Sequence, residues 1–294
     1  MDKLVADWIY TEGCNIPEGQ QLPSGVRRYA AIVQYNGADF CGFQRQKHSP
    51  SVQQELEKAL SYVANTAVII HCAGRTDTAV HASHQVIHFD TAVERTGYSW
   101  VQGANSQLPD SISLIWADAI SHDFHSRFSA GARTYRYVID NSATRPAIMA
   151  DAVTWFKKPL DILLMQQACQ YLLGEQDFSA FRGSGCQSNS PYRNVHKANV
   201  FRRGNLVIFE ITANAFLLHM VRNIVGSLLE VGTARQQPLW IQTLLAQGDR
   251  CKSAATAAPH GLYLVAVDYP AKFGLPVLAK GPVFLPATLD NTEE

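Results

Sequence analysis

The amino-acid sequence predicts an α+β fold with two domains, each built on a mostly antiparallel sheet. The chain has 294 residues, of which 47% are hydrophobic and 17% charged, enough for two folded domains of ordinary size. Segments with the two-residue alternation of strands are interleaved with segments of helical spacing. Neighbouring strand segments are separated by short turn signals, as in hairpins, which favours antiparallel pairing.

The first domain is predicted over residues 26–133. Its first strand, residues 28–35, ends at an Asn-Gly turn signal. Ser51 and Gln54 resemble a capping box, and the apolar residues that follow them recur at helical spacing. Further strands are predicted over residues 68–73, 85–89 and 112–120.

The second domain is predicted over residues 134–286, with strands and helices again interleaved. Strands are expected over residues 134–140, 206–213 and 262–268. Helices are expected over residues 160–173 and 217–231, closed by Gly174 and Gly232, and over residues 239–246. The two ends of the chain are interpreted as a flexible acidic leader, residues 1–25, and an acidic tail, residues 287–294.

The formal net charge is zero, but the charges are unevenly distributed. Residues 26–286 carry 24 basic and 18 acidic side chains, because acids are concentrated at both ends. The stretches 124–139 and 178–209 contain arginine and lysine and no acid. Local patches of this kind bind nucleic acid even on a near-neutral protein, although a solvated surface has the same composition.

Several classes of protein and site are excluded by pattern. No window approaches the roughly eighteen apolar residues of a membrane span, and no secretory signal begins the chain, so a cytoplasmic protein is expected. The six cysteines form no CxxC or CxxH pair, which argues against a zinc ribbon or a disulfide framework. His81, His84 and His88 lie close in sequence without a second ligand cluster, so no metal site is expected.

The segment most informative about chemistry is GRTDTAVHASHQVIHF, which begins at Gly74. It places a polar Gly-Arg-Thr-Asp turn, ending at Asp77, between two apolar strands. Loops held by rigid strands are where catalytic groups usually lie. The competing interpretation is structural, since Asp and Thr are common in turns for their backbone hydrogen bonds.

Seven blocks in the same order make the chain, from residue 28 to residue 286, similar to the tRNA pseudouridine synthase A family. The blocks are YNGADFCGFQRQ (35–46), SVQQELEKAL (51–60), GRTD (74–77), FHSRFSAGARTYRYVI (124–139), DFSAFRGSGCQSNSPYRNV (177–195), NAFLLHMVRNIVGSLLEVG (214–232) and HGLYLVAVDYP (260–270). The resemblance implies an isomerase that converts uridine to pseudouridine at positions 38, 39 and 40 of the tRNA anticodon stem-loop. It also implies two similar halves with antiparallel sheets joined across a pseudo-twofold axis, helices on one side, a basic RNA-binding cleft between the halves, and a homodimer. No cofactor is implied, and tRNA is the expected partner.

The resemblance also implies roles for individual residues. Asp77 matches the catalytic aspartate, which would attack C6 of the uracil, attack C1′ of the ribose, or act as a base. Tyr135 matches a tyrosine that packs against the target base, and Arg222 matches an arginine that pairs with the carboxylate. Arg75 matches an arginine that displaces the target nucleotide. The further candidates for binding the substrate are Arg182 and Arg193.

Each residue has a structural alternative. Tyr135 on an alternating strand has the pattern of a core aromatic. Arg222 lies within an apolar helical pattern, where an unpaired charge is costly, so a partner is expected and a structural salt bridge would serve as well. Thr78-Ala79 stands where the family has Ala-Gly, and Ala79 would cost about 1 kcal/mol if that position needs a positive φ. Two smaller departures, Phe43 for a common Trp and Leu218 for a common His, are interpreted as packing changes.

Three other functions compete with the synthase. A non-catalytic RNA-binding protein would keep the fold but would not need Asp77, Tyr135 and Arg222 together. A hydrolase pairing Asp77 with His81 or His84 would need a nucleophile that no motif supplies. A synthase acting on a different RNA is the nearest alternative.

Overall fold

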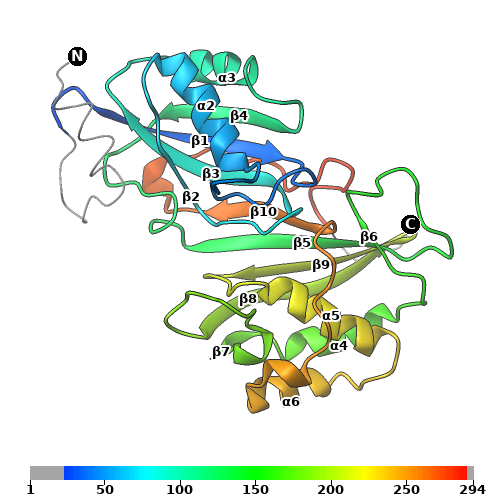
Figure 1. Ribbon diagram of the computed structural model, residues 1–294. Helices are drawn as coiled ribbons and strands as arrows, with labels where there is room; N and C mark the ends of the chain where they lie inside the picture. The colour runs from blue at the N-terminus through cyan, green and yellow to red at the C-terminus, as the bar shows by residue number, and fades with distance from the viewer. Residues whose placement is uncertain (1–22, 290–294) are drawn as a thin grey trace. The chain divides into compact units, whose positions relative to one another are not determined.

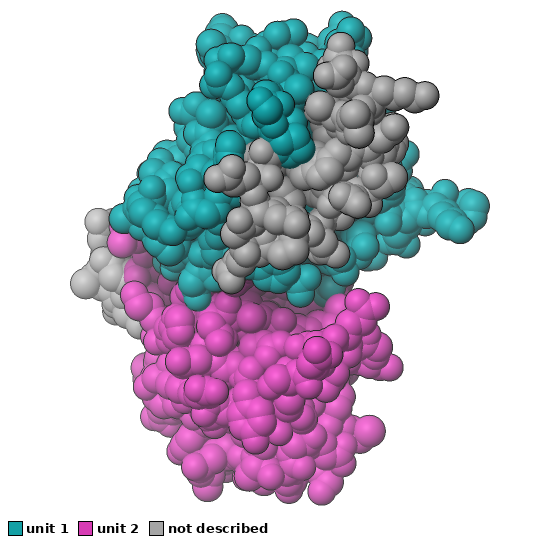
Figure 2. Space-filling model, turned by 90° about the vertical axis from the view of Figure 1, so that its left-hand side faces the viewer, with its two compact units in different colours: residues 1–131, 266–282 teal, residues 132–265, 283–294 magenta. Residues whose placement is uncertain are grey.

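The computed structural model describes residues 23–289 (Figure 1). Most of the predicted leader and all the acids of the predicted tail lie outside these residues. The chain forms two compact units, coloured separately in Figure 2. Unit 1 comprises Met1–Gly131 and Ala266–Pro282, and unit 2 comprises Ala132–Val265 and Val283–Glu294. Neither unit is a continuous block, because the chain returns to unit 1 within its last strand, β10 (Leu262–Asp268).

The sheet of unit 1 is antiparallel and centres on β1 (Arg27–Tyr35). β1 lies between β4 (Ile112–Ala119) and β3 (His81–Thr91), and β3 also pairs with the short β2 (Ile70–Cys72). β3 is longer at both ends than predicted, because nearly all its side chains are buried. A strand buried on both faces lacks the alternation that marks strand ends in a sequence.

Two helices, α2 (Val52–Ala64) and α3 (Gly97–Asn105), lie side by side in unit 1 (Figure 1). The hydroxyl of Ser51 accepts a hydrogen bond from the backbone N–H of Gln54 at 3.4 Å, which confirms that Ser51 caps α2. α3 was not predicted, because its residues GYSWVQGAN are weak helix formers. Burial of Trp100 against Tyr29 and Phe89 holds α3 in place.

The sheet of unit 2 has the antiparallel order β5 (Ala132–Asp140), β9 (Leu206–Ala213), β8 (Tyr192–Arg203) and β7 (Gly174–Asp177). The two-residue β6 (Thr154–Trp155) runs parallel to β5. Three helices complete the unit: α4 (Ile162–Gln170), α5 (Met220–Gly232) and α6 (Trp240–Gln247). Short 3-10 turns occur at Ser179–Phe181 and Arg250–Lys252, and in unit 1 at Ala271–Phe273.

Two helices of unit 2 are shorter than predicted. α4 covers Ile162–Gln170 rather than residues 160–173, and Gly174 begins β7. α5 begins at Met220 rather than at residue 217, because His219 takes a left-handed conformation with φ 58°. The other end of α5 agrees with the prediction, because Gly232 is its last residue. A Cβ there would lie 2.7 Å from Sδ of Met165 and 2.9 Å from a methyl of Leu160, so the glycine permits close helix packing.

The described chain thus has the mixed architecture and mostly antiparallel strand pairs that the sequence predicted, with five helices in all. The core of unit 2 includes Val138, Ile208 and Val265, which are fully buried. No helix in residues 23–289 combines the length and apolarity needed to cross a bilayer.

Candidate active site

The Asp77 loop (residues 73–80) connects β2 to β3 in unit 1. It is fastened by backbone hydrogen bonds from residues 40–43: the N–H of Phe43 donates to the carbonyl of Thr76 at 3.0 Å, and Phe40 accepts from Ala79 at 3.2 Å. The N–H of Val80 donates to the carbonyl of Asp77 at 3.1 Å and closes a turn. The side chain of Asp77 is half-buried at the start of this turn. The predicted polar connection is therefore a rigid turn with its carboxylate partly open to solvent.

Two glycines allow the chain to approach the Asp77 loop this closely. A Cβ at Gly37 would lie 2.1 Å from the carbonyl oxygen of Val80. A Cβ at Gly42, whose φ is +93°, would lie 2.8 Å from the carbonyl oxygen of Thr76. Both positions therefore exclude a side chain, and Gly42 also needs a backbone conformation that favours glycine.

A buried polar network supports the Asp77 loop from the sheet. The hydroxyls of Tyr35 and Thr76 lie 2.8 Å apart, and the side-chain amide of Gln85 donates to the carbonyl of Gly74 at 2.6 Å. The Nδ1 atom of His81 accepts the N–H of Gly37 at 3.0 Å. Because buried polar groups are costly to leave unpaired, this network favours one loop conformation over others. The ring of His81 is thus engaged in holding the backbone.

Ala79, which stands where the family pattern has glycine, takes a positive φ of 59°. The position does need the left-handed conformation, and an alanine there costs about 1 kcal/mol relative to glycine in backbone strain. The surrounding hydrogen bonds hold the loop in spite of that cost. Strain of this size is common beside functional groups.

In unit 2, the structure places Tyr135 within β5 and Arg222 in the first turn of α5. Tyr135 is 8% exposed and packs edge-to-face against Phe216, with ring centroids 5.0 Å apart. Arg222 is half-buried, and its Nε donates to the carbonyl of Ala257 at 2.9 Å. The N–H of Ala257 returns a hydrogen bond to the carbonyl of Arg222 at 3.1 Å. Arg222 is therefore held through both its side chain and its backbone carbonyl. One hydrogen-bond partner of its guanidinium is the backbone carbonyl of Ala257.

Arg182 and Arg193 come together around the loop 183–191 of unit 2. The guanidinium of Arg182 donates to the carbonyls of Cys186 and Ser188, both at 2.8 Å, and that of Arg193 donates to the Ser188 hydroxyl at 2.6 Å. Burial acts to raise the pKa of Cys186, but hydrogen bonds from Leu218, Ser188 and Arg182 outweigh it and lower the pKa. Both arginines thus order this loop, and Arg193 is almost fully buried.

Comparison with known proteins shows the family of the chain. The family model described as tRNA pseudouridine synthase matches residues 31–129 and 168–270. The chain belongs to the tRNA pseudouridine synthase family. It is 55% identical to a tRNA pseudouridine synthase A of Vibrio cholerae, over 90% of this chain and 100% of the relative. It is 54% identical to that of Shewanella amazonensis (88% and 99%) and 51% identical to that of Coxiella burnetii (89% and 100%).

Membership of the tRNA pseudouridine synthase family confirms the resemblance read from the sequence and the predicted enzyme class, an isomerase. The first matched region contains Arg75 and Asp77, and the second contains Arg182, Arg193 and Arg222. Tyr135 lies between the two regions, although the pairwise matches to relatives extend over about nine tenths of the chain. Arg75 and Asp77 belong to unit 1, and the other four residues belong to unit 2.

Some supporting residues were not predicted from the sequence. Tyr35, Thr76 and Gln85 form the network beneath the Asp77 loop, yet in the sequence they are ordinary members of strands and turns. The Asn-Gly signal did mark Gly37, but only as the end of a strand. Among residues 23–289, no three His, Cys, Asp or Glu side chains are placed to hold a metal ion.

Proposed function

We propose that the chain isomerises uridine to pseudouridine at positions 38, 39 and 40 of the tRNA anticodon stem-loop, with Asp77 as the catalytic carboxylate. The family match and the curated relatives, which are named as tRNA enzymes, support tRNA as the substrate. The observation that carries the proposal is the rigid Asp77 loop, which presents a half-buried carboxylate from a strained, hydrogen-bonded turn.

The chemistry explains why a fixed carboxylate is needed. The reaction breaks the glycosidic bond, turns the uracil over and rejoins the sugar through carbon, so it is redox-neutral. An anionic oxygen must reach the base or sugar in one defined geometry, and pre-organisation of that oxygen lowers the barrier. The backbone hydrogen bonds to Phe40 and Phe43 supply this pre-organisation.

The remaining site residues act on the substrate in the proposal. Arg75, which is exposed on the Asp77 loop, displaces the target nucleotide from its stack, since a paired uridine cannot reach a side chain. Tyr135 packs against the displaced base, and Arg222 pairs with the carboxylate. Arg182 and Arg193 contribute to RNA binding; both shape the loop 183–191, and Arg182 is the more exposed.

The proposal extends to the arrangement of the halves. Each unit has an antiparallel sheet with helices of its own, which supports two similar halves related by a pseudo-twofold axis. We place a basic RNA-binding cleft between them, with Asp77 at its floor, in a homodimer that works in the cytoplasm. The dimer is tested by sedimentation equilibrium of the purified protein: a mass near 32.5 kDa at micromolar concentration would contradict it.

Mapping of the product tests the substrate and the positions modified. Purified protein is incubated with unmodified tRNA carrying uridine at 38, 39 or 40, and pseudouridine is located by carbodiimide adducts and primer extension. Matched tRNAs with cytidine at those positions, and a structured ribosomal RNA fragment, serve as controls. Adducts confined to positions 38–40 are expected. Adducts in the ribosomal fragment alone would favour the synthase that acts on a different RNA.

A further inference from the structure

Phe128 lies in unit 1, in the connection that leads from β4 to β5, and is 70% exposed to solvent. Single exposed apolar residues are common on protein surfaces and need no explanation. Phe128 differs from such residues in how firmly its position is fixed. That rigidity, together with the charges around it, points to a ligand.

The backbone around Phe128 forms a closed turn. The Nδ1 atom of His125 accepts the N–H groups of Arg127 at 3.1 Å and Phe128 at 3.3 Å. His125 and Ser129 exchange two more hydrogen bonds, both of 2.9 Å. The Phe128 ring also packs on the His125 ring, with centroids 4.4 Å apart and planes tilted by 37°. The ring is therefore backed by His125, while most of its surface faces solvent.

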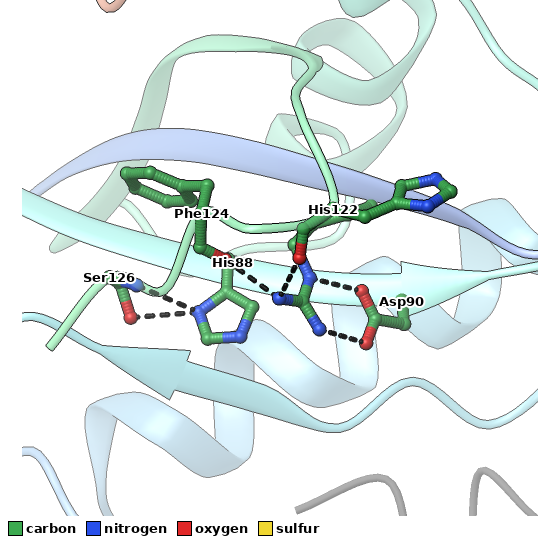
Figure 3. A network of polar contacts seen from close by, with 6 residues as sticks. His88, Asp90, His122, Phe124 and Ser126 are labelled. Atoms are coloured by element: carbon green, nitrogen blue, oxygen red, sulfur yellow. Dashed lines mark hydrogen bonds and ion pairs between the residues drawn. The ribbon is translucent and has the colours of Figure 1, made fainter. Parts of the chain in front are cut away.

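A second layer fixes His125. Its ring lies 4.5 Å from that of the buried His88, which stacks on His71 at 4.9 Å. Figure 3 shows His88 turned toward Ser126, whose hydroxyl lies 2.9 Å from Nδ1 of His88 and also donates to the carbonyl of His71 at 3.0 Å. The turn is thus anchored to β2 and β3. Little conformational entropy remains to be lost when a ligand meets the exposed ring.

The surroundings of Phe128 are basic. The guanidinium of Arg127 lies 5.5 Å from the centre of the Phe128 ring. Burial raises the pKa of Cys72 to about 12, and the charges of Arg75 and Arg127 act in the opposite direction. Residues 124–139 contain no acid. Arg127 is therefore the charged group beside the Phe128 ring, in a stretch of sequence without an acid.

We propose that Phe128 and Arg127 form a platform for an unpaired nucleotide of the tRNA other than the target uridine. The base stacks on the exposed part of the Phe128 ring, and Arg127 binds its phosphate. Base stacking on an aromatic side chain with a neighbouring cation is a general mode of binding single-stranded RNA. This inference rests on tRNA being the substrate under the proposed function.

Equilibrium binding of unmodified tRNA to three variants tests the platform. Phe128→Ala weakens tRNA binding by about 5- to 150-fold, the usual range for losing one stacked base. Phe128→Trp keeps the affinity, because it keeps an aromatic face. Tyr98→Ala is the matched control: Tyr98 is 76% exposed in α3 of the same unit, and its loss leaves the affinity unchanged. In steady-state assays Phe128→Ala raises KM and leaves kcat unchanged, because the contact is the same in the ground and transition states.

Arg127→Gln adds an independent readout. The slope of log Kd against log salt decreases by about one unit if one phosphate contact is lost. Wild-type affinity in Phe128→Ala would overturn the proposal. So would a change of sedimentation mass with unchanged affinity, which would assign Phe128 to a contact between copies of the chain. If wild type forms no pseudouridine while Phe128→Ala still loses tRNA binding, the proposed activity fails and the platform stands.

Discussion

The hydroxyl of Tyr35, the last residue of β1, lies 2.8 Å from the hydroxyl of Thr76, the residue directly before Asp77. The contact is buried, and Gln85 joins it from β3 by donating to the Tyr35 hydroxyl at 3.4 Å. The central strand of unit 1 is therefore connected through one side chain to the residue that precedes the candidate catalytic carboxylate. Packing of the sheet and geometry of the loop depend on the same tyrosine.

Tyr35→Phe is expected to lower kcat by about 10- to 100-fold with little change in tRNA affinity, because a small displacement of a catalytic group is costly in rate. Single-turnover rates and binding measure the two effects separately. Tyr29→Phe is the matched control: Tyr29 is a buried tyrosine of the same strand, whose hydroxyl meets Arg95 at 3.3 Å. Equal loss of kcat in both variants would mean that general destabilisation, not loop geometry, is the cause.

Ala79→Gly is expected to raise the free energy of unfolding by up to about 1 kcal/mol. Glycine relieves the strain of the positive φ at this position, and part of the gain is offset by greater freedom in the unfolded chain. Ala82→Gly, in strand β3, provides the comparison and is expected to lower stability. Urea unfolding of the two variants checks the sign, and a loss of stability in Ala79→Gly would show that the strain is not released.

Some parts of the fold and of the candidate site were predictable from the sequence, and others were not. The Asp77 turn and the Ser51 helix cap could be predicted because they depend on residues that are adjacent in the sequence. β8 was missed because YRNVHKANVFRR is rich in polar residues and its alternation is broken by a register shift against β9. The partners of Thr76 come from segments far away in the sequence. Such tertiary contacts leave no local pattern, and only the folded chain reveals them.

Loss of the buried Arg28–Asp90 ion pair is expected to destabilise unit 1 strongly. The two side chains are 6% and 9% exposed, with Nη2 and Oδ2 2.7 Å apart, and Arg28 also donates to the carbonyls of His122 and Phe124 (Figure 3). Asp90→Ala leaves a buried guanidinium without its counter-charge and should cost about 3–5 kcal/mol in urea unfolding.

Two comparisons test whether burial sets the size of that loss. Arg235→Ala breaks the solvent-accessible pair with Glu230 and should cost less than about 1 kcal/mol. The double variant Arg28→Met/Asp90→Leu should recover part of the stability lost in Asp90→Ala, because no buried charge remains unpaired. If Asp90→Ala cost as little stability as Arg235→Ala, the claim that burial makes the Arg28–Asp90 pair important would be contradicted.

Stability is expected to fall as the pH drops below about 6.5, the ordinary histidine value. Burial, with nearby positive charges, lowers the pKa of His88 well below its usual range and that of His125 to about 4. The unfolded chain then binds more protons than the folded one between about pH 6.5 and pH 4, so stability is complete above this window and lost within it. Each buried histidine contributes at most about 1.4 kcal/mol per pH unit, and the half-buried His125 less.

Urea unfolding at about pH 7.5 and pH 5 measures this dependence, and His88→Gln should flatten it while lowering the absolute stability. A pH slope that is the same in wild type and His88→Gln would mean that other groups cause the loss.

The measurement that tests the central claim most directly is the single-turnover rate of pseudouridine formation by Asp77→Asn, with tRNA binding measured on the same samples. Asp110→Asn, which changes an exposed aspartate in the turn before β4, is the control. The account predicts no detectable product from Asp77→Asn, unchanged tRNA affinity, and a wild-type rate for Asp110→Asn. Product formed by Asp77→Asn at a rate within about tenfold of wild type would contradict the claim that the Asp77 carboxylate carries the reaction.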